Sequence, residues 1–201
     1  MIMATNQGTK EQYLHQRMRD PNGTPGQVFV VAHRGVFLNE NGIELAENSI
    51  PAIERAKTIG CDMVEVDVRF TSDGTAIVMH DPDLNRTAAH GAVVADTRYN
   101  DLKDLDLVHP TTGVSLNAKI PTLEEAFSAL GDQMMINVEL KTGIEAISEV
   151  ARLAKQAGVS DQVTIKCNLE DASDYERVAR IVEQVEHPVD FIPVIIDTRT
   201  G

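Results

Sequence analysis

The chain has 201 residues, of which 42% are hydrophobic and 24% are charged, and these values are ordinary for one globular domain or part of a larger one. Its formal net charge of −13 argues against a nucleic-acid or anionic-membrane surface, because such surfaces need many basic side chains. The sequence holds no run of about 18 or more apolar residues, so we expect no membrane span.

The first 27 residues are polar and end in a turn rich in Pro and Gly. They predict an N-terminal arm, with a short helix around residues 11–19, in front of a single domain over residues 28–201. The arm lacks the apolar core of a secretory signal, so we expect a cytoplasmic protein if the chain begins at its true start. Cys61 and Cys167 lie far apart in the sequence, and we expect two buried thiols rather than a disulfide or a metal site.

The first strand is expected at Val28–Ala32, a continuous apolar run of the kind that is buried on both faces of a parallel sheet. It is followed directly by His33 and Arg34. A loop then leads to Glu47 and to a helix over residues 50–59, whose first turn has several residues able to cap it.

The next strand, Met63–Phe70, alternates with a period of two. Its valines share one face, and Glu65 and Asp67 share the other. Two carboxylates that point the same way are costly to crowd together unless a cation joins them. Hard divalent cations take oxygen ligands of this kind, so the strand predicts half of a metal site. The alternative is an exposed edge strand with solvated charges.

A third strand, Ala76–Met79, is expected after a tight turn, and it ends in His80 and Asp81. From residue 82 to residue 119 the pattern is irregular, and a stretch of that length predicts a functional insertion or lid. A further strand, Met135–Leu140, carries Asn137, Glu139 and Lys141 on one face. Further helices are expected from Thr122 and over 144–157 and 173–185, and further strands over 163–166 and 191–196.

Strands separated by helices of this length predict right-handed βαβ units and a parallel sheet, the organisation of a TIM (β/α)8-type barrel. In such a barrel the carboxyl ends of the strands converge on one rim, where active sites are built. The polar residues at four strand ends would then share one mouth. Each has a structural alternative: a strand-end His is often only a satisfied core residue, Asp81 can form a turn before Pro82, and Glu47 can belong to the helix cap.

The chain resembles the glycerophosphodiester phosphodiesterase family over roughly residues 28 to 170. The resemblance rests on six segments in a fixed order: Ala32-His33-Arg34-Gly35, Glu47-Asn48-Ser49, Glu65-Val66-Asp67, His80-Asp81, Ile120-Pro121-Thr122-Leu123 and Glu139-Leu140-Lys141. It implies a TIM barrel with an insertion after an early strand. It also implies hydrolysis of a glycerophosphodiester to glycerol 3-phosphate and an alcohol, with a divalent metal such as Mg²⁺ or Ca²⁺.

The resemblance assigns roles residue by residue. It makes Glu65, Asp67 and Glu139 the metal ligands. It makes His33 and His80 the general acid/base pair, which would exchange roles between formation and hydrolysis of a cyclic phosphate. Arg34 and Lys141 would hold the phosphate, and Glu47 would lie near the metal or a substrate hydroxyl. The chain departs from the family at Ala46 and Ser49, where Pro and Thr are frequent. It also lacks an aromatic residue after the fifth strand, and these departures leave the leaving-group alcohol open.

Two other functions fit the same segments. One is a phospholipase D-like phosphodiesterase on the same scaffold, against which the acidic charge and the missing secretion signal count. The other is a barrel that binds a phosphate ester without turning it over, against which the two histidines count. The partner in each case is a small-molecule substrate, and the sequence leaves the oligomeric state open.

We count six barrel strands where a TIM barrel needs eight. The sequence therefore predicts a barrel truncated after about six strands, without its last two βα units. The first and sixth strands, Val28–Ala32 and Phe191–Ile196, would then form the edges of the sheet.

Overall fold

A computed structural model of the chain describes residues 28–132, 134–169, 171–185 and 190–195. The expected N-terminal arm, with its helix at residues 11–19, lies outside these residues. Within the described part of the chain, no helix is long and apolar enough to cross a membrane.

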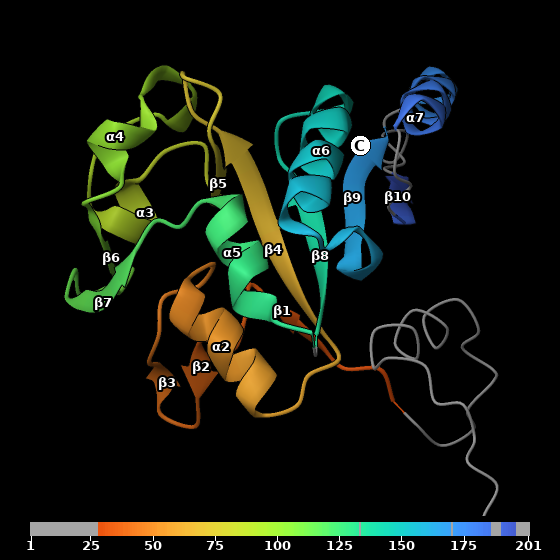
Figure 1. Cartoon of the computed structure of the whole chain (residues 1–201). Coiled ribbons are helices and arrows are strands. Elements are labelled where there is room, and N and C mark those ends of the chain that lie inside the picture. Colours follow the sequence, from red (N-terminus) through yellow and green to blue (C-terminus); the bar gives the residue numbers. More distant parts are fainter. Residues whose placement is uncertain (1–27, 133, 170, 186–189, 196–201) are drawn as a thin grey trace, which may run out of the picture.

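One sheet organises the described residues, and five of its strands run parallel in the order β1-β4-β8-β9-β10. Their bounds are β1 Val31–His33, β4 Met63–Phe70, β8 Met135–Leu140, β9 Val163–Leu169 and β10 Asp190–Ile195. Helices connect them: α2 Ile50–Thr58, α5 Leu123–Leu130, α6 Ile147–Ala157 and α7 Ala172–Gln184, with short 3₁₀ turns η2 Ile144–Ala146 and η3 Ser160–Gln162. Figure 1 shows α2, α5 and α6 in front of the strands.

Helices α2 and α5 begin where their capping residues predict. Ser49 is the N-cap of α2 and accepts a hydrogen bond from the Ala52 N–H at 3.4 Å. At α5 the Thr122 side chain accepts from the Glu125 N–H, while the Glu125 carboxylate accepts from the Thr122 N–H. This reciprocal capping box satisfies two amide groups that the first helical turn leaves without partners.

The helices cover the apolar face of the sheet. Alternate residues of β4 and β8, such as Val66 and Val138, pack there against Phe127 of α5 and are almost fully buried. Because side chains alternate along a strand, the residues in between point to the opposite face. At the start of the strands that second face is closed by Met63 and Met135, and beyond them it becomes polar.

Two sequence-based expectations about the strands were wrong. The strand expected at Ala76–Met79 is β5, Ala76–Val78, which pairs antiparallel with β4 and is not a parallel barrel strand. The run Val28–Ala32 is not buried on both faces, since Val30 and Val31 are 46% and 47% exposed. The physical reason is that β1 forms one edge of the described sheet, where it borders only β4. The opposite edge is β10, and the expected last residue of that strand, Ile196, lies outside the described residues.

Residues 82–119 form short elements around their own apolar cluster, the part drawn in yellow-green and green at the side of the sheet in Figure 1. Leu84, Leu102 and Leu107 are its fully buried centre. The elements are α3 Asn85–Ala88, η1 Val94–Asp96, α4 Tyr99–Leu102, β6 Asp106–Val108 and β7 Ser115–Lys119. Its role as a functional insertion or lid stays a prediction.

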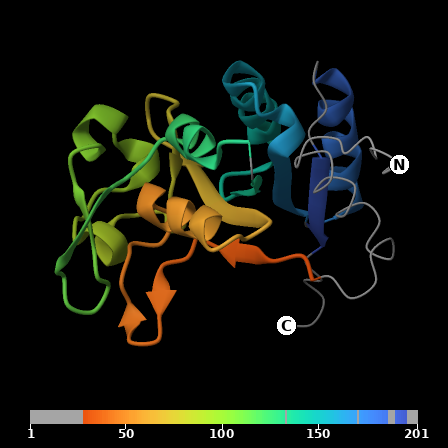
Figure 2. The ribbon, with the colours of Figure 1, turned by 60° about the horizontal axis from the view of Figure 1, so that its bottom comes forward.

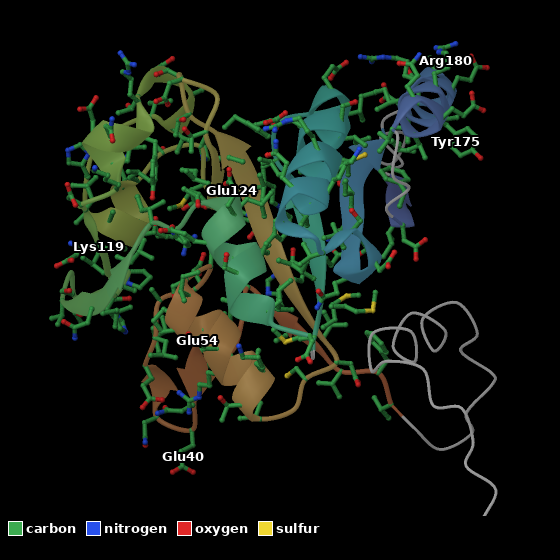
Figure 3. All side chains as sticks on the ribbon, viewed as in Figure 1. Glu40, Glu54, Lys119, Glu124, Tyr175 and Arg180 are labelled. Carbon is green, nitrogen blue, oxygen red and sulfur yellow. The ribbon has the colours of Figure 1, made fainter. Side chains whose placement is uncertain are left out.

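A small hairpin, β2 Leu38–Asn39 and β3 Gly42–Ile43, lies between β1 and α2 in the chain and projects away from the sheet (Figure 2). Many charged side chains lie on the outside of the molecule. Figure 3 labels Glu40, Glu54 and Lys119 among them, and all three are exposed.

Candidate active site

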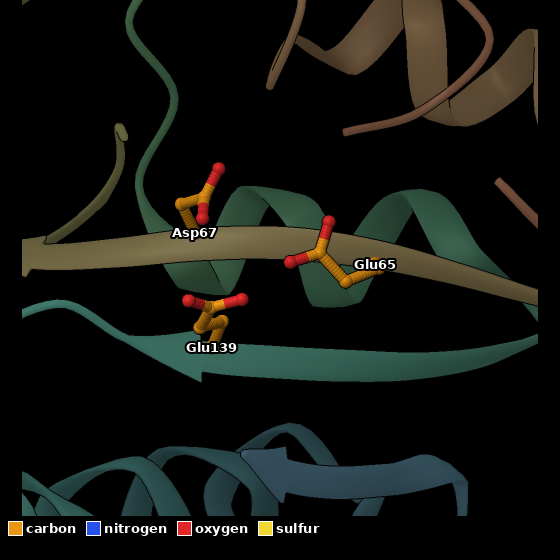
Figure 4. A group of neighbouring side chains, drawn as sticks. All are labelled: Glu65, Asp67 and Glu139. Carbon is orange, nitrogen blue, oxygen red and sulfur yellow. The ribbon is translucent and has the colours of Figure 1, made fainter. Parts of the chain in front are cut away.

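Three carboxylates meet on the polar face of the sheet, over β4 and β8 (Figure 4). Asp67 and Glu139 are register partners on the two strands, and Glu65 lies one alternation earlier on β4. Each of the three offers an oxygen, and these oxygens lie within 4.8 Å of one another. The residues are only 6%, 1% and 8% exposed for Glu65, Asp67 and Glu139. The alternative of a solvated edge strand was therefore wrong, because β4 lies between β1 and β8.

The carboxylates do not share equal environments. Burial, reinforced by the charges of Asp67 and Glu139, raises the pKa of Glu65 to about 7. Glu65 Oε2 accepts the Arg34 N–H at 3.1 Å, while its buried Oε1 has no hydrogen-bond partner among the described residues. Such an unpaired buried oxygen is costly unless a cation reaches it.

Glu139 is held in the opposite state. Burial alone would raise its pKa, but hydrogen bonds from Lys141 and Lys166 outweigh that effect and lower the pKa to about 2. The Lys141 ammonium also lies 3.1 Å from Asp67 Oδ1. Its own pKa is raised: burial works against the charged form, and the contacts with Glu139 and Asp67 prevail.

Asp67 is positioned by the loop in front of α2. The Asn48 side chain donates from Nδ2 to Asp67 Oδ2 at 2.8 Å, and its Oδ1 accepts the Asp67 N–H at 3.2 Å. Asn48 is 2% exposed and adopts a left-handed φ of +54°, a conformation that Asn tolerates better than most residues. A tight turn thus places one side chain across both the backbone and the carboxylate of Asp67.

The end of β1 supplies His33 and Arg34. Arg34 also has a left-handed φ, and Gly35 follows with a φ of +80°. A Cβ at Gly35 would lie 2.7 Å from the Cβ of Ala52, so the turn packs directly on α2. The His33 side chain is 69% exposed, and its Nε2 lies 3.9 Å from Glu65 Oε2.

His80 reaches the site because β5 runs back along β4. The Met79 N–H donates to the Asp67 carbonyl at 2.8 Å, which sets His80 beside the carboxylate level of β4. His80 Nδ1 lies 2.6 Å from Asp81 Oδ1. A hydrogen bond from Arg86 outweighs burial and, with His80, lowers the pKa of Asp81 to about 2, so this carboxylate is ionised at neutral pH.

Glu47 links Arg86, which contacts Asp81 beside His80, to Arg34, which contacts Asp67. Its oxygens accept from Arg86 at 2.6 and 3.1 Å and from Arg34 at 2.9 Å. Arg34 Nε in turn lies 3.2 Å from Asp67 Oδ2. Burial alone would raise the pKa of Glu47, but the two guanidinium groups lower it. Glu47 is thus a bridging residue rather than part of the helix cap.

The structure brings the predicted residues together. Seven of them are linked by direct contacts, namely His33, Arg34, Glu47, Glu65, Asp67, Glu139 and Lys141. The eighth, His80, joins them through Asp81, Arg86 and Glu47. Their roles as ligands, acid, base or phosphate-binding groups stay predictions.

Sequence reasoning missed three residues of this network. Asn48 belongs to one of the segments that carry the resemblance, but no role was assigned to it. Lys166 had a signal, because Thr164 and Lys166 interrupt an apolar strand with a period of two. Arg86 had none, since it lies in the irregular stretch 82–119 and its partners are distant in sequence.

The donor set fits a hard divalent cation. Three carboxylate oxygens converge, and the buried Glu65 Oε1 and Asp67 Oδ1 accept no hydrogen bond from the described residues. Oxygen is the ligand that Mg²⁺ and Ca²⁺ prefer. Together these features indicate a metal site without fixing which ion it takes.

Comparison with known proteins agrees with the resemblance seen in the sequence. A model of the glycerophosphoryl diester phosphodiesterase family matches residues 33–179. The chain is 36% identical over 119 residues to a glycerophosphodiester phosphodiesterase of Caldanaerobacter subterraneus, which covers 59% of this chain and 47% of that protein. The chain therefore spans about half the length of this curated relative.

Solved structures share the fold. A glycerophosphodiester phosphodiesterase from Agrobacterium tumefaciens superposes with a TM-score of 0.64 at 24% identity, over 79% of this chain and 65% of that one. A phosphodiesterase from Oleispira antarctica, solved with the product sn-glycerol-3-phosphate, gives 0.58 at 21% identity over 86% of each chain. The predicted TIM-barrel class is confirmed, and the described sheet holds five of the eight parallel strands of that fold.

Proposed function

The chain belongs to the glycerophosphoryl diester phosphodiesterase family, and on this premise we propose that it hydrolyses glycerophosphodiesters to glycerol 3-phosphate and an alcohol. The observation that carries the proposal is the buried cluster of Glu65, Asp67 and Glu139, with His33 at 3.9 Å from Glu65 and His80 joined to it through Asp81, Arg86 and Glu47. A product complex of the Oleispira antarctica protein supports the same substrate class.

Glu65, Asp67 and Glu139 would hold the divalent cation, for which Mg²⁺ or Ca²⁺ is the expected identity. When bound, such a cation supplies neutralisation of the charge on the non-bridging phosphate oxygens. Arg34 and Lys141 would add the cationic groups that orient the phosphate, because both already lie against Asp67. With a divalent ion present, they leave the site with a net positive charge, which favours an anionic diester.

His80 is prepared for proton transfer by its neighbour. Because the pKa of Asp81 is about 2, its ionised carboxylate accepts a hydrogen bond from the Nδ1–H of His80, with 2.6 Å between Nδ1 and Oδ1. That fixes the tautomer and leaves Nε2 to exchange a proton with the substrate. Arg69 adds a second restraint, since its Nε donates to the His80 carbonyl at 2.8 Å.

His33 would be the second proton-transfer group. Its ring is largely exposed, in contrast to the three carboxylates, and lies beside Glu65 at the end of β1. A route with an internal glycerol hydroxyl as nucleophile needs one base to take the hydroxyl proton and one acid to protonate the leaving alcohol. Two separate histidines meet that need, whereas phosphate binding alone requires neither.

The test is release of glycerol 3-phosphate from glycerophosphocholine by the 201-residue chain, with added Mg²⁺, Ca²⁺ or Mn²⁺ and with EDTA. We expect product with a cation and none with EDTA. Replacement of His33 or His80 by Ala should lower kcat/KM by on the order of 10²-fold or more. Lysophospholipids belong in the same screen, because the alcohol side of the substrate is open. No release under any cation, with the chain folded by circular dichroism, contradicts the proposal.

A further inference from the structure

Lys166 lies inside the candidate site, although no motif singled it out. Strand β9 runs parallel to β8, and Lys166 is the register partner of Glu139. Thr164, two residues earlier on the same face, accepts a hydrogen bond from Asn137 Nδ2 at 2.7 Å. Both contacts show that Lys166 is on the polar face of the sheet, where its ammonium donates to Glu139 Oε2.

Two ammonium groups occupy both oxygens of Glu139. Lys141 donates to Oε1 and Lys166 to Oε2. Together with Arg34, they set three cationic side chains against the three acidic ones. A divalent cation that uses Glu139 must take an oxygen that already faces an ammonium, and the like charges repel at that distance.

We propose that Lys166 competes with the divalent cation for Glu139 and thereby sets how tightly this site holds its metal. The inference rests on the proposed function, because it takes the three carboxylates as cation ligands. Lys166 and the cation cannot both bind Glu139 Oε2 at the same time. When the cation is bound, the displaced ammonium adds positive charge to the mouth of the site, where an anionic substrate enters.

Lys166 suits this role better than Lys141. The Lys141 side chain is 17% exposed and contacts two carboxylates, Asp67 and Glu139. The Lys166 side chain is 30% exposed and contacts Glu139 alone among these acids, so its long stem can swing into water at less cost.

The test is direct binding of Mn²⁺, without substrate, to the 201-residue chain by titration calorimetry. K166M keeps the length of the side chain and removes the charge, and it should bind Mn²⁺ on the order of tenfold more tightly than the wild type. K166R restores the charge and should return the affinity to the wild-type level. The control K103M removes an exposed lysine of the 82–119 segment and should leave the affinity unchanged. Equal or weaker binding by K166M, including no binding by either protein, overturns the inference.

A second measurement needs no variant. Amine acetylation of the wild type, quantified by peptide mass spectrometry, should increase at Lys166 when Mn²⁺ is added and stay constant at Lys103. Unchanged labelling of Lys166 at saturating Mn²⁺ overturns the inference. Failure of the proposed function is separate: cation-dependent hydrolysis with equal Mn²⁺ affinities refutes only the role of Lys166, whereas tighter binding by K166M without any hydrolysis refutes only the proposed activity.

Discussion

Replacement of Glu65 by Gln should have opposite effects on the metal-free and the metal-loaded protein. Glu65 is buried beside Asp67 and Glu139, with one oxygen that lacks a partner among the described residues. Gln keeps the shape, still accepts the Arg34 N–H, and offers an amide N–H to the neighbouring carboxylates. Without metal, E65Q therefore removes a crowded charge. With metal, it would remove one of the three proposed ligands.

The structure sets the size of the effect. Two unit charges 4.8 Å apart repel by about 1 kcal/mol in water-like surroundings and by about 3–4 kcal/mol at an effective dielectric of about 20. The pKa of Glu65, raised from 4.5 to about 7, corresponds to about 3 kcal/mol. Since lysines already offset part of the repulsion at Glu139, we expect E65Q to stabilise the metal-free chain by about 1–3 kcal/mol.

The sign of the pH dependence follows from the raised pKa of Glu65. Folded wild type holds this proton up to a higher pH than the unfolded chain does, so it loses stability as the pH rises from about 4.5 to about 7. E65Q has no such proton to lose. The advantage of the variant should therefore be complete above pH 7 and vanish near pH 4.5.

The assay is urea unfolding followed by circular dichroism, in EDTA at pH 5 and pH 8 and then in Mn²⁺. Wild type should gain about 2.7 kcal/mol at a Mn²⁺ concentration 100-fold above Kd, and E65Q almost nothing. The control E54Q removes an exposed carboxylate of α2 (Figure 3) and should change neither value. An E65Q protein that is less stable than wild type in EDTA at pH 8, or that gains equal stability from Mn²⁺, refutes the reasoning.

Two further predictions concern the supports of the site. D81N removes the carboxylate that holds His80 and Arg86, so kcat/KM should fall on the order of 10²-fold or more. The pKa of Asp81 is lowered from 3.8 to about 2, so its ion pairs stabilise the fold by about 2 kcal/mol above pH 4. This stabilisation is lost as the pH falls through about 2. The unfolding free energies of wild type and D81N should therefore converge as the pH falls, and a constant difference between them would contradict the prediction. G35A should destabilise the chain by at least about 1 kcal/mol more than G113A in urea unfolding, because both residues have a positive φ but only Gly35 is crowded, by Ala52; equal costs would show that the close contact is unimportant.

The centre of the site was predictable because a strand has only two faces. The alternation in Met63–Phe70 and Met135–Leu140 is enough to place Glu65, Asp67 and Glu139 on the side away from the helices. Parallel pairing of the two strands then brings the three carboxylates together. The capping box at the start of α5 was equally local, since both of its partners lie within four residues.

The direction of β5 was not read correctly, although the chain carries the information. Only five residues separate Phe70 from Ala76, and a parallel crossover needs a dozen or more. The short turn, in which Gly74 has a φ of +79°, therefore forces an antiparallel return. An apolar run alone shows that a strand exists but not which way it runs. The correction also explains why His80 comes back to the level of Asp67 instead of leaving the site.

Neither the burial of Val28–Ala32 nor the partners of Arg86 could be predicted from the sequence, and the reason is different from that for β5. Burial of a strand depends on what lies beside it, and β1 borders only β4 in the described sheet. Arg86 contacts Glu47, which is 39 residues away in the chain. Neither a composition nor a periodicity encodes such distant neighbours, so only the folded arrangement reveals them.

The ion pairs of the site explain how three acidic side chains can be buried close together. An isolated buried carboxylate would cost several kcal/mol. Here Arg34 and Lys141 face Asp67, and Lys141 and Lys166 face Glu139. Only Glu65 is left without a side-chain cation in hydrogen-bond contact, and its pKa is the one that burial raises to about 7. Among the three carboxylates, Glu65 is therefore the one whose buried charge is least compensated by neighbouring side chains, and a cation bound beside it would offset that cost.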